Sequence, residues 1–249
     1  MKLTCLLTHL AALSLLASCA STGRPSANVD AKTSAALTAM SDKLAAAKTV
    51  KVTARRTATS GYFLGDAMAE NARITASVRR PDKFAAQLQT NRGSRSVVYD
   101  GRQLLLADHQ AKTHAVTAAP PTFDQALRVW HESYGYLPPL AELLVSNPKS
   151  FLLDGVTKGS YGGVSVIEGE TTEQFTFSQE GFAWSLWISS GSGLPKKIES
   201  TYPNGEGGAP LRLTAIIDRW DLDAPLPPSA FTVSEPRNST SIEMIPLNQ

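Results

Sequence analysis

From Thr49 to Ala118 apolar and polar residues alternate with a period of two, and this pattern constrains the fold more than any other feature of the chain. Successive side chains of a strand point to opposite faces of a sheet, so the alternation predicts strands with one buried face. Turn sequences interrupt it, and Asp100-Gly101 is the strongest hairpin signal among them. We therefore expect an antiparallel meander of about six strands.

Helical spacing occurs before and after this meander. Asp30 is expected to cap a helix that runs to about Lys48. After Pro120-Pro121, Thr122 and Gln125 form a capping box for a second helix that ends near Gly135. A shorter helix over 140–145 and a turn over 148–153 should follow. Because this insertion is apolar on one face only, we expect it to pack on the open side of the sheet.

A second set of strands is expected from Val156 onward, and the last of them is a short strand around 231–233. The sequence shows no internal repeat and no linker between the two sets of strands. We therefore expect residues 29–247 to form a single domain.

The N-terminus has the pattern of an exported lipoprotein. The apolar run over 3–16 ends in Leu16-Ala17-Ser18-Cys19, which resembles a bacterial lipobox. That resemblance implies a signal peptide over 1–18, a diacylglyceryl group on the Cys19 thiol, an acyl group such as palmitate on the new amine, and a flexible tether over 19–28. An ordinary secretory signal that contains a cysteine is the alternative. No later apolar run approaches the ~18–20 residues that cross a bilayer, so we expect attachment through lipid alone.

Composition excludes several functional classes. The only cysteines are Cys5 and Cys19, so the folded domain would hold no disulfide, cysteine nucleophile or thiolate metal site. The formal net charge of the full chain is +2 and basic residues do not cluster, which argues against a nucleic-acid partner.

Histidines and aspartates provide the remaining candidates for chemistry. His109, His114 and His131 have no metal-ligand spacing, and we interpret them as exposed histidines of turns and strand ends. A second group lacks the glycine and distal glutamate of a calcium loop and favours a solvated edge or turn: Asp218, Asp221 and Asp223. Nucleophile-elbow, zinc-protease and phosphate-loop motifs are missing from the sequence. We therefore expect no metal, no cofactor and no enzymatic activity.

Several phrases together resemble an uncharacterised family of predicted periplasmic proteins within the LolA/LolB lipoprotein-carrier superfamily. They cover nearly all of the chain in one order: Val78–Phe84, Val98–Leu104, Tyr134–Leu144, Gly155–Gly159, Trp184–Ile188 and Asp218–Leu222. The resemblance implies a mainly β fold with helices: an incomplete antiparallel barrel of about eleven strands, covered by helices over an apolar cavity. Many members carry a Cys-His-His run where this chain has Thr172-Glu173-Gln174, so no redox or metal role is transferred.

The inward faces of the expected strands are apolar. The candidate cavity residues are Phe84, Leu88, Val97, Leu104, Leu106, Phe175, Phe177, Trp184, Leu186, Leu213 and Ile217, with Trp130 and Phe123 as a lid. Periodicity alone leaves a filled core and a ligand cavity equally open. Arg79 and Arg80 are candidates for the cavity mouth.

These observations favour a lipid-anchored protein on the periplasmic face of the cell envelope, at the outer membrane. Its expected role is to hold a hydrophobic ligand, such as an acyl chain, a lipid or a lipoprotein, without covalent chemistry. A scaffold that binds another envelope protein or senses a signal, with no lipid ligand, is the alternative.

Overall fold

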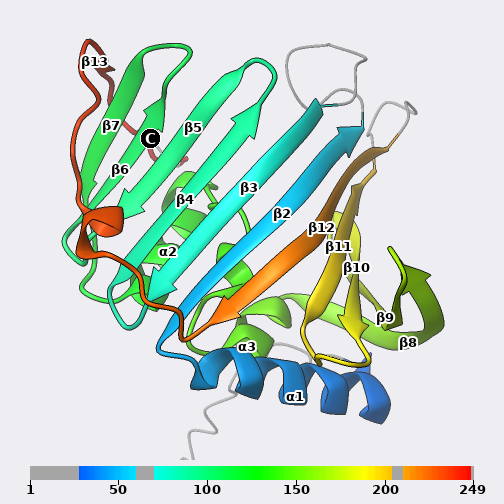
Figure 1. Cartoon of the computed structure of the whole chain (residues 1–249). Helices are drawn as coiled ribbons and strands as arrows, with labels where there is room; N and C mark the ends of the chain where they lie inside the picture. Colours follow the sequence, from blue (N-terminus) through cyan, green and yellow to red (C-terminus); the bar gives the residue numbers. More distant parts are fainter. Residues whose placement is uncertain (1–27, 60–69, 204–209, 248–249) are drawn as a thin grey trace, which may run out of the picture.

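The computed structural model describes residues 28–59, 70–203 and 210–247, so Cys19 and the rest of the expected signal and tether up to residue 27 lie outside the described residues. In the described part thirteen strands form a single sheet, and the helices α2 and α3 lie against one of its faces (Figure 1). The strands are β1 (Asn28–Val29), β2 (Thr49–Thr59), β3 (Glu70–Arg79), β4 (Lys83–Thr90), β5 (Gly93–Tyr99), β6 (Gln103–Asp108), β7 (Thr113–Ala118), β8 (Val156–Ile167), β9 (Glu170–Gln179), β10 (Phe182–Ser189), β11 (Pro195–Tyr202), β12 (Leu211–Leu222) and β13 (Thr240–Ser241). The helices are α1 (Ala31–Ala46), α2 (Phe123–Tyr134), α3 (Pro148–Leu152) and the short 3₁₀ helices η1 (Ala141–Leu143) and η2 (Pro228–Phe231).

The sheet is open, and its order is β1-β8-β9-β10-β11-β12-β2-β3-β4-β5-β6-β7-β13. Strands β2 to β7 pair with their sequence neighbours in antiparallel fashion, which confirms the six-strand meander. β1 and β13 have two residues each, pair in parallel fashion, and cover the two edges of the sheet. Eleven longer strands remain between them, so the predicted incomplete antiparallel sheet with helices on it is confirmed.

The first helix begins where the sequence predicts. The Asp30 carboxylate accepts hydrogen bonds from the backbone N–H of Thr33 at 2.7 Å and from that of Tyr161 on β8 at 2.8 Å. These bonds satisfy a free donor of the helix N-terminus and tie that end to the sheet. The helix then runs across one end of the sheet, where it contacts β8 and α3 (Figure 1).

The second helix is also capped as predicted. Thr122 accepts from the backbone N–H of Gln125, and Gly135 ends the helix with a φ of +61°, a conformation that glycine adopts without a steric penalty. The apolar face of α2 packs onto the sheet. The Phe123 ring stacks on Phe84 with centroids 4.6 Å apart, and Trp130 meets Tyr99 edge-on at 5.5 Å.

The prediction of a short strand around 231–233 is wrong. Residues 228–231 form the 3₁₀ helix η2, and no strand covers 231–233. Pro227 and Pro228 have no N–H to donate to a ladder, and Phe231 is buried as part of a turn. We call residues 223–247 the C-terminal strap, because it leaves β12, runs along the meander and pairs with the edge strand β7 (Figure 1).

All described elements and the hydrophobic core lie between Asn28 and Met244. A chain that starts at residue 20 therefore keeps every contact of the described fold. None of the described helices is long and apolar enough to cross a membrane.

Candidate functional site

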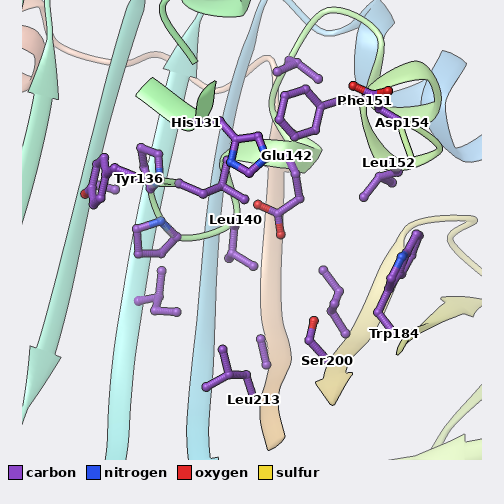
Figure 2. A pocket seen from close by; sticks show the side chains of 18 of the residues that line it. His131, Tyr136, Leu140, Glu142, Phe151, Leu152, Asp154, Trp184, Ser200 and Leu213 are labelled. Carbon is purple, nitrogen blue, oxygen red and sulfur yellow. The ribbon is translucent and has the colours of Figure 1, made fainter. Parts of the chain in front are cut away.

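A cavity of about 900 Å³ lies between the sheet and the helical insertion, as Figure 2 shows from close by. The inner face of the sheet forms its floor. The roof consists of α2, the segment 135–140, η1 and α3. This volume lies within the ~300–1,000 Å³ range of ligand pockets in proteins.

Floor residues come from β2 to β5 and from β9 to β12. Strand register brings them into rows: Trp184 pairs with Ser200, Ser200 with Leu213, and Ala215 with Ile198. The apolar side chains of the floor are Ile74, Ala86, Leu88, Val97, Phe182, Trp184, Ile198, Leu213 and Ala215.

The floor is only partly covered. Ile198, Leu213 and Ala215 are half-buried, although their strands lie between neighbours in the middle of the sheet. Their exposed surface faces the cavity. At the other end of the inner face, Phe84 and Tyr99 are fully buried under α2. The same sheet face is thus a packed core under α2 and an open apolar floor beside it.

The roof is held by polar contacts. The Arg80 guanidinium donates to the carbonyl oxygens of Ala47, Leu144 and Val145 at 2.8, 3.1 and 2.9 Å, and burial lowers its pKa. Asp124 on α2 accepts from the backbone N–H of Ser146 at 3.0 Å. Together these bonds fix the short segment that carries η1 over the sheet.

Arg79 and Arg80 do not lie at the cavity mouth, contrary to expectation. Arg80 donates to backbone carbonyl groups, including two of the segment after η1. The Arg79 guanidinium lies over the Phe231 ring at 5.1 Å. Neither residue lines the cavity. Both guanidinium groups contact other parts of the chain. The Arg-Arg sequence alone does not indicate these contacts.

Charged residues surround the mouth. The exposed ones on α2 are Arg128, His131 and Glu132. Asp154 contributes beyond α3, and Arg56 and Arg95 contribute from β2 and β5. A polar rim around an apolar floor would match a ligand with an apolar body and a polar end.

Two titratable groups of the roof have raised pKa values. Burial raises the pKa of Tyr136 well above its usual value. Burial also raises the pKa of Glu142 to about 7. Because a low-dielectric environment disfavours the charged form, both shifts report apolar surroundings.

Of the eleven candidate cavity residues and the two lid candidates, four line the cavity: Leu88, Val97, Trp184 and Leu213. Seven others are fully buried core residues beside or beneath it: Phe84, Leu104, Trp130, Phe175, Phe177, Leu186 and Ile217. Leu106 is partly buried and packs against that core. Phe123, the second lid candidate, belongs to the packed part under α2.

Sequence reasoning missed much of the roof and part of the floor. Tyr136, Phe151 and Leu152 belong to short segments without a clear period. Ile198 lies on a strand where charged residues obscure the alternation. Glu142 is an isolated acid between apolar residues, and no motif marks it.

The histidines do not gather. His109 lies 2.9 Å from the Ser96 hydroxyl, and His131 lies at the cavity mouth. His114 is not exposed as expected: it is buried beneath the C-terminal strap, where its Nδ1 lies 2.7 Å from the Ser239 hydroxyl. The described residues contain no group of three or more His, Cys, Asp or Glu that would fit a metal ion.

The three aspartates have separate partners. Asp218 accepts from Arg55 at 2.8 Å, Asp221 accepts from Arg219, and Asp223 accepts from the backbone N–H of Lys48. Asp223 lies in the turn after β12, whereas Asp218 lies on β12, which is an interior strand and not an edge. The hydrogen bonds of these carboxylates therefore stabilise the sheet and its turns.

Residues 33–245 match the model of a family described as predicted periplasmic protein (DUF2092). The chain belongs to the DUF2092 family. The resemblance to a family of predicted periplasmic proteins is thereby confirmed, and the match covers every element that forms the cavity. No curated protein sequence matches this DUF2092 chain.

Solved structures with a similar arrangement share little sequence. A chain of the Pseudomonas aeruginosa MucA/MucB complex is 15% identical with a TM-score of 0.43, over 82% of this chain and 62% of that one. The Mycobacterium tuberculosis lipoprotein LppX is 13% identical with a TM-score of 0.42, over 78% and 96%. A LolA superfamily protein from Nitrosomonas europaea is 10% identical with a TM-score of 0.35, over 80% and 96%. The DUF2092 chain thus spans less than two thirds of the matched chain from the MucA/MucB complex.

Proposed function

We propose that this DUF2092 protein holds a lipid acyl chain in its cavity at the periplasmic side of the cell envelope and performs no covalent chemistry. The half-buried apolar side chains on the floor carry this proposal. Each methylene group that leaves water for such a site contributes about 0.8 kcal/mol. A chain with ten buried methylene groups would therefore gain about 8 kcal/mol before the entropy of binding is subtracted.

In this proposal the protein binds the ligand and does not change it chemically. The floor offers apolar side chains, and the nearby polar groups form the rim. Such a site suits storage or transfer of a lipid between membranes. A scaffold for another envelope protein, without a lipid ligand, is the outcome if the cavity remains empty.

A cavity-filling variant tests the proposal. Leu213→Trp places a larger side chain on the floor, so we expect native mass spectrometry to show loss of lipid that co-purifies with the chain from residue 20 onward. Ile216→Trp is the matched control, because Ile216 lies on the same strand, is also half-buried and does not line the cavity. A parent protein that carries no lipid and binds none of an added monoacylglycerol would contradict the proposal.

We further propose that Cys19 anchors the protein in the outer membrane through its acyl groups. One acyl chain gives only marginal membrane binding, whereas several chains give stable anchoring. Mass spectrometry of the mature N-terminal peptide should show an acylated Cys19. Cleavage at another residue with an unmodified N-terminus would show an ordinary secretory signal instead.

A further inference from the structure

The roof of the cavity contains one carboxyl group that the proposed function does not use. Glu142 lies in η1 between Ala141 and Leu143, both of which are fully buried. Leu140, directly before this segment, has a φ of +61°, which is uncommon for a residue with a side chain. Figure 2 shows the Glu142 carboxyl group pointing from the roof toward the sheet.

The carboxyl group has no cationic partner in the described part of the chain. The Glu142 side chain is half-buried and lines the cavity, and the effect of its own backbone N–H, which lowers its pKa, is outweighed by burial. Leu140, Phe151 and Leu152 line the same region of the roof. Burial without a compensating charge raises its pKa to about 7, so much of the population carries a neutral carboxylic acid at neutral pH.

A neutral carboxylic acid both donates and accepts a hydrogen bond. An ester or hydroxyl group of a ligand would satisfy it without bringing a charge into the cavity. The carboxylate of a free fatty acid would bring a negative charge into these apolar surroundings, and an ammonium group would have to lose its hydration. The surroundings of Glu142 therefore favour an uncharged polar group directly next to the acyl chain.

We propose that Glu142 is the polar anchor of the cavity and selects uncharged acyl esters, such as acylglycerols, over free fatty acids. This inference rests on the proposed function, because it requires an acyl chain in the cavity. It adds the chemical class of the ligand and the residue that recognises it.

Other titratable or charged groups line the cavity and enter any pH dependence. On α2 and after it they are Asp124, Arg128, His131, Glu132 and Tyr136; Asp154 follows α3; and the sheet contributes Arg56, Arg95 and Tyr202. A pH effect belongs to Glu142 only if substitution of that residue removes it.

Isothermal titration of the chain from residue 20 onward with monopalmitoylglycerol and with palmitate tests this selection. We expect the glycerol ester to bind at least about tenfold more tightly at pH 7, and its affinity to fall between pH 6 and pH 8.5 as Glu142 loses its proton. Glu142→Leu should weaken ester binding about tenfold and abolish the preference. Glu142→Gln should keep the preference and remove the pH dependence, because its amide still donates. Glu243→Leu is the matched control and should change neither, because Glu243 is an exposed acid of the C-terminal strap that does not line the cavity.

The outcomes separate the two proposals. If neither probe binds, the proposed function fails. If both probes bind equally and Glu142→Leu leaves their affinities unchanged, the cavity holds acyl chains and the anchor role of Glu142 is overturned. A folded Glu142→Gln variant that keeps the parent pH profile would also overturn it.

Discussion

At the scale of one residue, the burial of the Glu142 carboxyl group in the cavity roof lowers the free energy of unfolding. Its pKa is raised from 4.5 to about 7 by burial. Between these values the unfolded chain releases the proton while the folded chain retains it. The free energy of unfolding therefore falls as pH rises through this window, by about 1.4 kcal/mol per unit, and the loss is complete above pH 7.

Glu142→Gln should remove this loss. We expect the variant and the parent to have similar urea midpoints at pH 4.5, and the variant to be more stable by up to about 3 kcal/mol at pH 8. Urea unfolding at both pH values measures the difference. Glu132→Gln is the control, since an exposed acid at the rim should give no such effect. An equal stability difference for Glu142→Gln at both pH values would contradict this account.

Single residues were predictable where their chemistry is local. Asp30 and Thr122 were identified as helix caps because a cap is a pattern of three or four neighbouring residues. Glu142 was not, because its role depends on Phe151 and Leu152 and on a sheet far away in sequence. Arg80 likewise gains its role from carbonyl groups of Ala47, Leu144 and Val145.

At the scale of elements, the C-terminal strap links the sheet edge to the cavity roof. The backbone N–H groups of Thr240 and Ile242 donate to carbonyl oxygens of Lys112 and His114 beside and on β7. The N–H of Leu247 donates to the Ser133 carbonyl at the end of α2 at 2.9 Å. The strap therefore covers an edge strand and holds the helix that borders the mouth.

Deletion of residues 240–249 should loosen both elements. Loss of these three hydrogen bonds is expected to cost about 3 kcal/mol and to lower Tm by roughly 10 °C. Thermal unfolding followed by circular dichroism measures this change. Ile245→Asp is the control, because that side chain is 73% exposed and should tolerate the substitution. A truncated protein with the parent Tm would show that the strap is dispensable.

The long elements were predictable and the short ones less so. Six strands of the meander and both capped helices follow from periodicity over many residues. The strand expected around 231–233 is a 3₁₀ turn, because Pro227 and Pro228 outweigh a short apolar alternation. Nothing in the sequence indicates that the strap returns to β7, since β13 has only two residues.

At the scale of the whole molecule, a packed core and an open cavity share one sheet face. Phe84, Tyr99 and Trp130 fill the space under α2, and Leu213 and Ile198 remain half-buried beside it. Alternation predicts which residues point inward, and it gave the same signal for both groups. Where the helices lie decides which of them are covered, and that placement depends on tertiary contacts that no local pattern contains.

Trp184 offers the most direct test of the claim that an acyl chain occupies the cavity. It lines the cavity, stacks on Phe177 with centroids 4.0 Å apart, and is the one tryptophan of the chain among the lining residues of the described part. The measurement is quenching of tryptophan fluorescence by a monoacylglycerol that carries bromine on its acyl chain, in the parent and in Trp184→Phe. The account predicts saturable quenching in the parent and its loss in Trp184→Phe, which keeps an aromatic ring against Phe177. Absence of quenching in the parent, or equal quenching in both proteins, would contradict it.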